Sequence, residues 1–354
     1  MARLHIVPDT DHRFRIPLLF IFLAALLVVL ILLDLMTGSV KIPAGKIFSL
    51  LVGADGENQI WSTILHEFRV PKTLTAILAG SALAVSGLQM QTIFRNPLAG
   101  PDVLGISSGA SLGVALVVLG FGDFFSMHSL SLLSSWFQII AAWIGAAVVL
   151  FLVLFVSLRV RDIMTILILG ILFGSAASAF VSILQYFSQQ SMLKAFVIWS
   201  MGSLGNLSGI QLRVLFISLL GGFALTMITL KVLNAMLLGE TYSRSMGVNI
   251  KVTRILIFIS TSILSGSVTA FCGPVAFVGI AVPHLARLIF KTADHEVLFP
   301  ACMLLGSLLM IVADLLSQVP GSAIVLPINS VTALLGIPVV IWVIFYNRKM
   351  VSVS

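Results

Sequence analysis

Charged residues are scarce in this sequence. Of its 354 residues, 9% are Asp, Glu, Lys or Arg and 59% are hydrophobic, whereas ordinary soluble domains carry about 25% charged residues. A chain of this length with so few charges has too little polar surface to cover its apolar side chains in water. This excludes a soluble globular enzyme, a disordered chain and a coiled coil. It leaves a protein that crosses a lipid bilayer several times.

Cysteines and catalytic motifs are also lacking. Cys272 and Cys302 are the two cysteines of the chain, and both lie in apolar or glycine- and proline-rich stretches. They indicate neither a disulfide framework nor a metal cluster. The six histidines are scattered, and neither a P-loop nor an H-E-x-x-H pattern occurs. The sequence therefore predicts no catalytic residue, no metal site and no cofactor bound by this chain.

Acidic residues are nearly absent from the predicted membrane segments. Asp314 falls inside a predicted span, and Asp34 is expected at the outer end of the first span. Asp102 and Asp162 open predicted helices and are expected to cap them. Proton-driven carriers usually place several ionisable groups at mid-membrane. We therefore expect the chain to take its energy from a partner, with an ion- or proton-coupled secondary transporter as the alternative.

Long, unbroken apolar runs make up most of the chain. A helix needs about 20 apolar residues to cross a bilayer, whereas a membrane β-barrel needs alternating segments of about 10 residues. We therefore predict an all-α integral membrane protein with ten transmembrane helices, the first being a retained span rather than a signal peptide. The predicted spans cover about residues 16–36, 73–93, 103–121, 135–157, 163–187, 210–232, 252–271, 275–291, 297–316 and 326–346.

The distribution of basic residues predicts the orientation of these spans. The chain carries 20 Lys and Arg against 13 Asp and Glu. With the N-terminus inside, the cytoplasmic segments hold 14 of the basic residues and the outer segments hold 6. Cytoplasmic loops of membrane proteins carry such an excess. We therefore predict that both termini are cytoplasmic, and we assign the net positive charge to this bias rather than to a nucleic-acid partner.

Small residues recur at helical spacing in three of the predicted spans. Such stripes allow helix backbones to approach closely, so they predict compact packing between helices, with a dimer face or a substrate wall as the alternative. The residues concerned are Ala76, Gly80, Ala84 and Gly87; Gly105, Gly109 and Gly113; and Gly170 and Gly174.

The longest polar segment between cytoplasmic span ends runs from Leu237 to Asn249. It combines two glycines with apolar side chains that are expected to be exposed, namely Leu237, Leu238, Tyr242 and Met246. A plain surface loop is one interpretation of this segment. Apolar anchors surrounded by polar groups are also typical of a docking surface for a soluble partner.

Several segments, in order along the chain, resemble the FecCD-type permeases, which are the membrane subunits of ABC importers for ferric siderophores, haem and vitamin B12. The resemblance extends over about residues 69–346. The matching segments are R-V-P-K-T-L from Arg69, N-P-L-A-G-P-D-V-L-G from Asn96, W-S-M-G from Trp199, L-L-G-E-T-Y-S-R-S-M-G-V from Leu237, G-P-V-A-F-V-G from Gly273, V-P-H-L-A-R from Val282 and T-A-L-L-G-I-P from Thr332.

The resemblance implies one permease domain over residues 1–354 with the ten-helix BtuC-like fold. It implies a homodimer in the inner membrane, two cytoplasmic ATPase subunits that bind ATP and Mg²⁺, and an extracytoplasmic substrate-binding protein. The cargo would be a ferric siderophore, haem or cobalamin, and no cluster of residues selects among the three. The related manganese and zinc permeases are a rival class, which the ten predicted spans disfavour because that class is expected to have fewer.

The resemblance also implies roles for particular residues. Residues of the cytoplasmic loop at about 234–251 would dock the ATPase, with Gly239 and Gly247 allowing tight turns. These docking residues are Leu237, Gly239, Glu240, Ser243, Met246 and Gly247.

Two further sets of residues are implied. Arg69 and Lys72 would contact acidic groups of the binding protein, with headgroup anchoring as the alternative. Ser175, Ser178 and Ser182 share one helix face and would line the substrate path, with hydrogen bonding between helices as the alternative.

Overall fold

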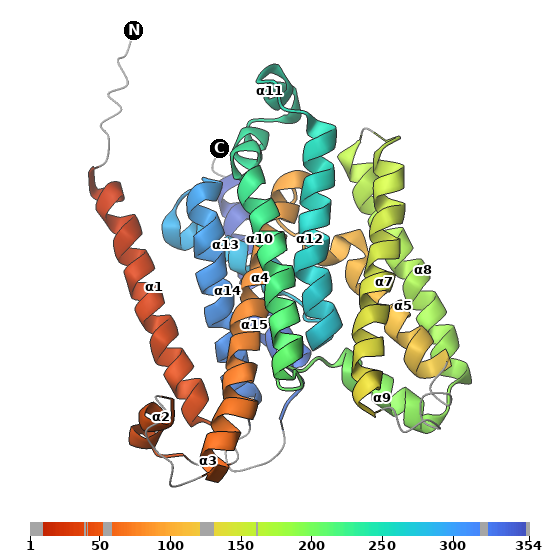
Figure 1. Cartoon of the computed structure of the whole chain (residues 1–354). Helices are drawn as coiled ribbons and strands as arrows, with labels where there is room; N and C mark the ends of the chain where they lie inside the picture. The colour runs from red at the N-terminus through yellow and green to blue at the C-terminus, as the bar shows by residue number, and fades with distance from the viewer. Residues whose placement is uncertain are drawn as a thin grey trace.

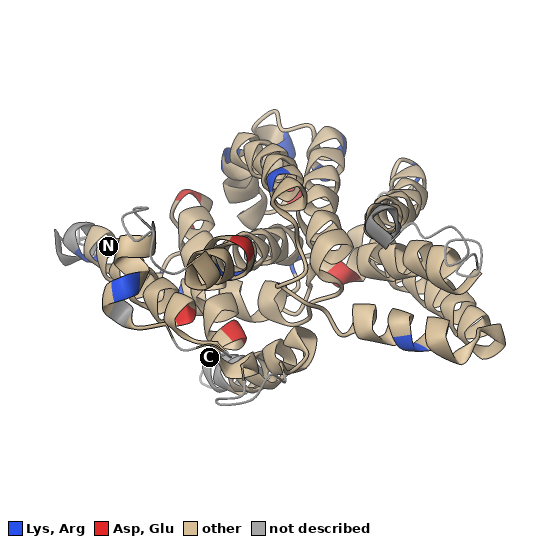
Figure 2. Cartoon of the chain, turned by 60° about the horizontal axis from the view of Figure 1, so that its bottom comes forward, with Lys and Arg blue, Asp and Glu red and all other residues tan. Residues whose placement is uncertain are grey.

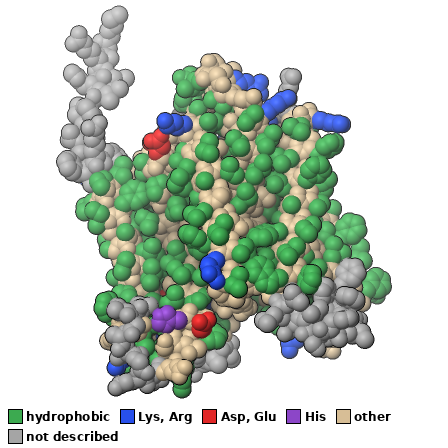
Figure 3. All heavy atoms as spheres, viewed as in Figure 1, with side chains coloured by type: hydrophobic (Ala, Val, Ile, Leu, Met, Phe, Trp, Pro, Cys, Tyr) green, Lys and Arg blue, Asp and Glu red, His purple; other side chains and the backbone are tan. Residues whose placement is uncertain are grey.

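The computed structural model describes residues 10–38, 40, 42–51, 59–120, 131–160, 162–318 and 325–351. Within these ranges the chain is helical, and its extended pairing is limited to one β-bridge between Gln318 and Val325. The helices run roughly side by side in one bundle (Figure 1). Hydrophobic side chains cover the flank of this bundle (Figure 3). Figure 2 shows how few charged residues the helices carry.

The bounds of the helices follow the predicted spans closely. Helix α8 (Ile163–Phe187) occupies the predicted range, because Asp162 caps its start by accepting hydrogen bonds from the Met164 and Thr165 amides. The other long helices are α1 (Thr10–Met36), α4 (Val70–Phe94), α7 (Ser131–Ser157), α10 (Gly209–Leu237), α12 (Ile250–Cys272), α14 (His295–Ser317) and α15 (Ile328–Val351).

Shorter helices connect or complete these long ones. Helix α4 is continuous with α3 (Gln59–Thr63) and with a π-helical turn, η1 (Ile64–Arg69). The remaining short elements are α2 (Ala44–Leu51), the 3₁₀ turn η2 (Pro101–Leu104), α5 (Ile106–Ala115), the π-helical turn η3 (Leu116–Gly120), α9 (Gln190–Ser200), α11 (Glu240–Ser245) and α13 (Val278–Phe290).

Seven helices in the described part of the chain are long and apolar enough to cross a membrane. Three shorter apolar helices cover Ile106–Gly120, Val278–Phe290 and Ile328–Trp342, where the sequence also predicts spans. The all-α, multi-span architecture is therefore confirmed. The count of ten and the cytoplasmic placement of the termini stay predictions. The described ends of α1 and α15 point toward the end of the bundle that carries α11 (Figure 1).

Helix α4 forms the centre of the bundle and packs against α10, α12, α13 and α14. Glycines set the distance in two of these pairs. A Cβ atom built on Gly80 would lie 2.1 Å from the Gly306 carbonyl oxygen, and one built on Gly87 would lie 1.7 Å from the Gly279 carbonyl oxygen. Since no side chain fits at such distances, the predicted stripe of small residues serves close helix packing.

A second group of helices, α5, α7 and α8, lies on the opposite side of the bundle from α1 (Figure 1). Its contacts also depend on small residues. A Cβ atom on Gly113 would lie 1.9 Å from the Ala141 carbonyl oxygen, and one on Gly170 would lie 2.3 Å from that of Val103. Helix α12 contacts both α4 and α7, so it joins this group to the centre of the bundle.

A buried polar network ties three of the central helices together. The Gln89 amide of α4 donates to the Thr226 hydroxyl of α10 at 3.0 Å and accepts from the Thr261 hydroxyl of α12 at 3.0 Å. The Ser260 hydroxyl lies 2.9 Å from that of Thr226. Because buried polar groups are costly unless they are hydrogen-bonded, this network fixes the mutual register of α4, α10 and α12.

Candidate functional site

Helix α11 is a short helix between the ends of α10 and α12, and it projects from the bundle (Figure 1). Sharp turns flank it at Gly239, with φ of +113°, and at Gly247, with φ of +84°. Residues with a Cβ atom rarely adopt these backbone conformations. The two glycines therefore allow the chain to leave α10, form one short helix and return into α12.

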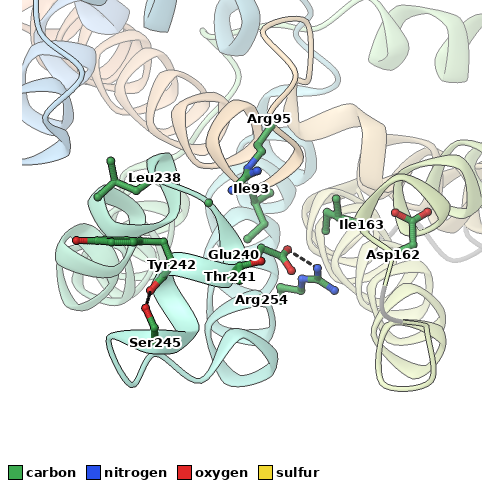
Figure 4. Close-up of a pocket in the computed structure, with 11 residues that line it drawn as sticks. Ile93, Arg95, Asp162, Ile163, Leu238, Glu240, Thr241, Tyr242, Ser245 and Arg254 are labelled. Atoms are coloured by element: carbon green, nitrogen blue, oxygen red, sulfur yellow. Dashed lines mark hydrogen bonds and ion pairs between the residues drawn. The ribbon is translucent and has the colours of Figure 1, made fainter.

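Two arginines hold the base of α11 against the bundle. The Arg254 guanidinium of α12 pairs with the Glu240 carboxylate at 2.5 Å (Figure 4), and its side chain is buried. The Arg95 guanidinium, from the end of α4, donates to the Met236 carbonyl oxygen at 3.2 Å. Charge-assisted hydrogen bonds therefore connect α11 to α12 and connect the end of α10, which leads into α11, to the end of α4.

The apolar side chains of the α11 segment point outward, as the sequence predicts. Leu238 is 66% exposed and Met246 is 60% exposed, while Leu237 and Tyr242 are about half exposed. Ser243 differs, because it is fully buried and its hydroxyl donates to the Gly239 carbonyl oxygen at 2.8 Å. Ser243 therefore stabilises α11 from within, whereas the four apolar residues form a patch that we call the α11 patch.

A cleft of about 680 Å³ lies beside α11 and reaches the start of α8 (Figure 4). Arg95, Arg254, Glu240 and Asp162 contribute charged groups to its walls. The Asp162 carboxylate has a pKa below its ordinary value, because the hydroxyl and amide of Thr165 and the amide of Met164 donate hydrogen bonds to it. The cleft is thus bordered by both positive and negative groups that could contact a soluble partner.

At the other end of the bundle, Arg69 is buried and bonded within the chain. Its guanidinium donates to the Leu35 carbonyl oxygen at 2.5 Å and also to that of Val40. These hydrogen bonds attach Arg69 to the end of α1 and to the segment that follows it. The structure does not test the prediction that Arg69 docks a binding protein, but it assigns the side chain a contact inside this chain.

Lys72 lies between two buried carboxylates. Its ammonium nitrogen is 2.7 Å from an Asp314 oxygen and 3.9 Å from an Asp34 oxygen. Thr73 donates to Asp34 at 2.5 Å, and Gln318 donates to Asp34 at 3.3 Å and to Asp314 at 3.1 Å. We call Asp34, Lys72 and Asp314 the ion triad; it joins α1, α4 and α14. The docking role of Lys72 stays a prediction.

The sequence marks two members of the ion triad, each by itself. Asp314 stands out as an acidic residue within a predicted span, and Asp34 ends the first predicted span. Nothing in the sequence brings these two carboxylates to Lys72, because the three residues are far apart along the chain. The tertiary packing of α1 and α14 against α4 does so.

Two of the three serines of α8 line a cavity of about 470 Å³. Ser178 and Ser182 line it, whereas Ser175, although exposed on the same helix, does not. Further hydroxyls come from α5 and α9, including Ser107, Ser108, Ser111 and Ser200. The cavity is therefore walled by helices that are distant in sequence and is lined largely by small polar groups.

Asp102 also lines this cavity, which the sequence did not predict. Its carboxylate accepts a hydrogen bond from the Ser107 hydroxyl at 2.5 Å. Asp102 lies in the first turn of η2, but the expectation that its side chain caps the following helix is wrong, because α5 begins at the N-cap Gly105 with no side-chain hydrogen bond. The 3₁₀ turn, followed by Gly105 with φ of +72°, separates Asp102 from α5 and leaves it on the cavity wall.

Known proteins resemble this chain over nearly its whole length. The family model described as the FecCD transport family matches residues 26–346. This chain belongs to the FecCD transport family. The vitamin B12 import system permease protein BtuC of Klebsiella pneumoniae is 36% identical over 327 residues, which cover 92% of this chain and 93% of the relative. The protein of the same name from Salmonella typhi is 34% identical over 328 residues, covering 92% and 94%.

A solved structure matches the fold of this FecCD-family chain. It is described as a metal-chelate type ABC transporter in an inward-facing conformation, and it aligns with a TM-score of 0.81 and 27% identity over 94% of this chain and 99% of the other. The chain is thus a multi-pass membrane protein and a transporter component of the ABC permease class, not an enzyme. These comparisons do not favour a secondary transporter.

Proposed function

We propose that this chain is the permease subunit of an ABC importer in the inner membrane. It would form a homodimer and carry a large metal chelate or tetrapyrrole, such as a ferric siderophore, haem or cobalamin, from a substrate-binding protein to the cytoplasm. Separate ATPase subunits would bind ATP and Mg²⁺ and supply the energy. The vitamin B12 import relatives and the metal-chelate neighbour support this class of cargo.

The α11 patch is the observation that carries the proposal. Its exposed apolar side chains stand on and directly beside the short helix α11, outside the apolar flank of the bundle and next to a cleft with charged walls. Such a combination is typical of a protein interface, where apolar anchors supply most of the affinity and rim charges supply orientation. An ATPase that closes on ATP would move α11, and Arg95 and Arg254 would pass that motion to α4 and α12.

The path for the cargo would run along the polar cavity, with Ser178 and Ser182 in its wall. Ser175 belongs to the same exposed face of α8 and would contact cargo only outside this cavity. At the outer end, we propose that Arg69 and Lys72 act mainly by holding α1, α4 and α14 together. Any contact with a binding protein would then use their residual exposed surface.

The test is a pull-down of the cognate ATPase subunit with the purified permease. Leu238→Asp combined with Met246→Asp should reduce ATPase association at least about fivefold, since two apolar anchors are worth about 1–3 kcal/mol together. Ile210→Asp is the control, because Ile210 is 59% exposed at the opposite end of α10. Equal association of the double variant and the wild type would refute the role of α11.

A further inference from the structure

The polar cavity has one charged group in its lining. Among the described residues that form its wall, Asp102 is the ionisable one, and neither Lys, Arg nor His contributes. The remaining polar groups are neutral hydroxyls and amides, including Ser107, Ser178 and Asn329. Because a hydroxyl can both donate and accept, these groups suit many uncharged cargoes equally. Asp102 therefore determines the sign of the charge in the cavity lining.

The Asp102 carboxylate is available to a molecule in the cavity. The Ser107 hydroxyl donates to its Oδ1 atom, and no other described residue bonds the carboxylate. Asp102 is exposed in the single chain, and neighbouring atoms surround its carboxyl group. A carboxylate with unused lone pairs, next to helices that exclude water, attracts donors and cations and repels anions more strongly than it would in bulk water.

We propose that the cavity selects its cargo by charge and that Asp102 is the residue that does so. The cargo class it takes is neutral or positively charged and carries hydrogen-bond donors such as amides; polyanionic chelates, for example ferric tris-catecholates, are disfavoured. This inference rests on the proposed transport function, because it concerns the same cavity, but the charge of the cavity can be measured without transport.

The first experiment measures the sign of the potential with a thiol probe. In purified full-length permease carrying Ser178→Cys, two methanethiosulfonates of similar size are compared, one with a trimethylammonium group and one with a sulfonate group. Each rate is divided by the rate with a small thiol in solution. Cys272 and Cys302 are buried, so they contribute little background. The cationic reagent is expected to react faster by roughly four- to fifteen-fold, for charges about 10 Å apart at effective dielectric constants of about 80 to 40.

Asp102→Asn should bring this ratio close to one, because it removes the charge and keeps the shape. Ser107→Ala should leave the ratio high, because it removes a hydrogen bond and keeps the charge. The same reagents at Ser245→Cys, on α11 and outside the cavity, should show no response to Asp102→Asn. In the Ser178→Cys protein with Asp102 intact, about 1 M salt should lower the ratio measured at position 178, since the Debye length is then about 3 Å; this readout needs no change at Asp102.

A ratio that is near one with Asp102 present, or that is unchanged by both Asp102→Asn and salt, would overturn the inference. Failure of Ser178→Cys to react at all would also overturn it, because the cavity would then be closed. These outcomes are distinguishable from failure of the proposed function, which appears as equal ATPase association of the Leu238→Asp/Met246→Asp variant and the wild type in the pull-down and leaves the reagent ratio unaffected.

The second experiment uses cargo. Liposomes that contain the permease and its ATPase subunits are loaded with ATP on the ATPase side, and uptake of a neutral amide-bearing corrinoid is compared with uptake of a trianionic ferric tris-catecholate. The wild type should prefer the neutral probe, and Asp102→Asn should raise uptake of the anion relative to the neutral probe about fourfold or more. A preference that is the same in both proteins would contradict selection by Asp102.

Discussion

Replacing Lys72 with methionine removes the positive group that lies between two buried carboxylates. The Lys72 ammonium is 2.7 Å from Asp314 and 3.9 Å from Asp34, whose side chains are 4% and 0% exposed. Methionine preserves the length and the apolar stem of the lysine. Thr73 and Gln318 remain as neutral donors, and they cannot replace the positive charge of the ammonium group. The free energy of unfolding should therefore fall.

The magnitude follows from burial. Removing one partner from a buried ion pair costs about 3–5 kcal/mol, because the other charge is left uncompensated. The Lys72 side chain is 19% exposed, so water reduces the effect and the lower limit of about 3 kcal/mol applies. With an unfolding entropy of about 2.1 cal/mol/K per residue, a chain of 354 residues should lose roughly 4 °C in Tm.

Thermal unfolding in detergent can be followed with a thiol-reactive fluorophore, because Cys272 and Cys302 are both buried in the folded chain. Lys194→Met is the control; Lys194 is an exposed lysine on α9, and its loss should change stability by no more than about 0.5 kcal/mol. Adding Asp34→Asn and Asp314→Asn to Lys72→Met should restore most of the Tm, because the buried charges are then gone together.

The result also separates the two roles considered for Lys72. If Lys72 acts mainly by docking a binding protein, Lys72→Met would leave the Tm at the wild-type value and would weaken only that association. A Tm unchanged within about 1 °C, roughly what about 0.5 kcal/mol produces, would refute the ion triad as a structural support. Failure of the triple variant to recover would show that the uncompensated carboxylates are not the cause.

Three further predictions use the same unfolding assay. Gly87→Ala should cost about 1–3 kcal/mol or more, because its Cβ would lie 1.7 Å from the Gly279 oxygen, whereas Gly221→Ala, with open space around it, should be neutral or stabilising by up to about 1 kcal/mol; equal Tm values would contradict the packing. Gln89→Leu should cost about 1–3 kcal/mol, since the buried Thr261 hydroxyl loses the Gln89 oxygen as its acceptor, and an unchanged Tm would argue against the network. For Asp162→Asn, the wild type should be more stable at neutral pH and lose this advantage as the pH falls below the ordinary value of 3.8, because the folded pKa is depressed; a difference independent of pH would refute this.

Elements with a strong local signal were predicted well. The apolar run and the capping aspartate define α8 as Ile163–Phe187, because both act within a few residues. The glycines at 239 and 247 and the apolar residues around them predict an exposed, sharply turned segment, and the structure contains one at α11. The predicted sixth span ended at about residue 232, whereas α10 continues to Leu237, since apolar residues recur between Lys231 and Leu237.

Contacts between distant segments were not predictable in the same way. The partners of Gln89 lie more than a hundred residues away in α10 and α12, so the sequence shows a polar residue in an apolar helix without showing what satisfies it. Asp102 was expected at a cap because it precedes an apolar run. A 3₁₀ turn and Gly105 place it on a cavity wall instead.

The sequence by itself determined that this protein spans a membrane and which of its segments are helical. It also determined that the polar segment after α10 differs from the other connections between helices. These properties depend on hydrophobicity, helix caps and glycine, all of which act locally. Only the tertiary structure decided which charges meet and which polar groups share a cavity. The ion triad and the Asp102 cavity arise where helices from distant parts of the chain pack together, and burial there changes what each charge does, because a low dielectric strengthens both pairing and repulsion.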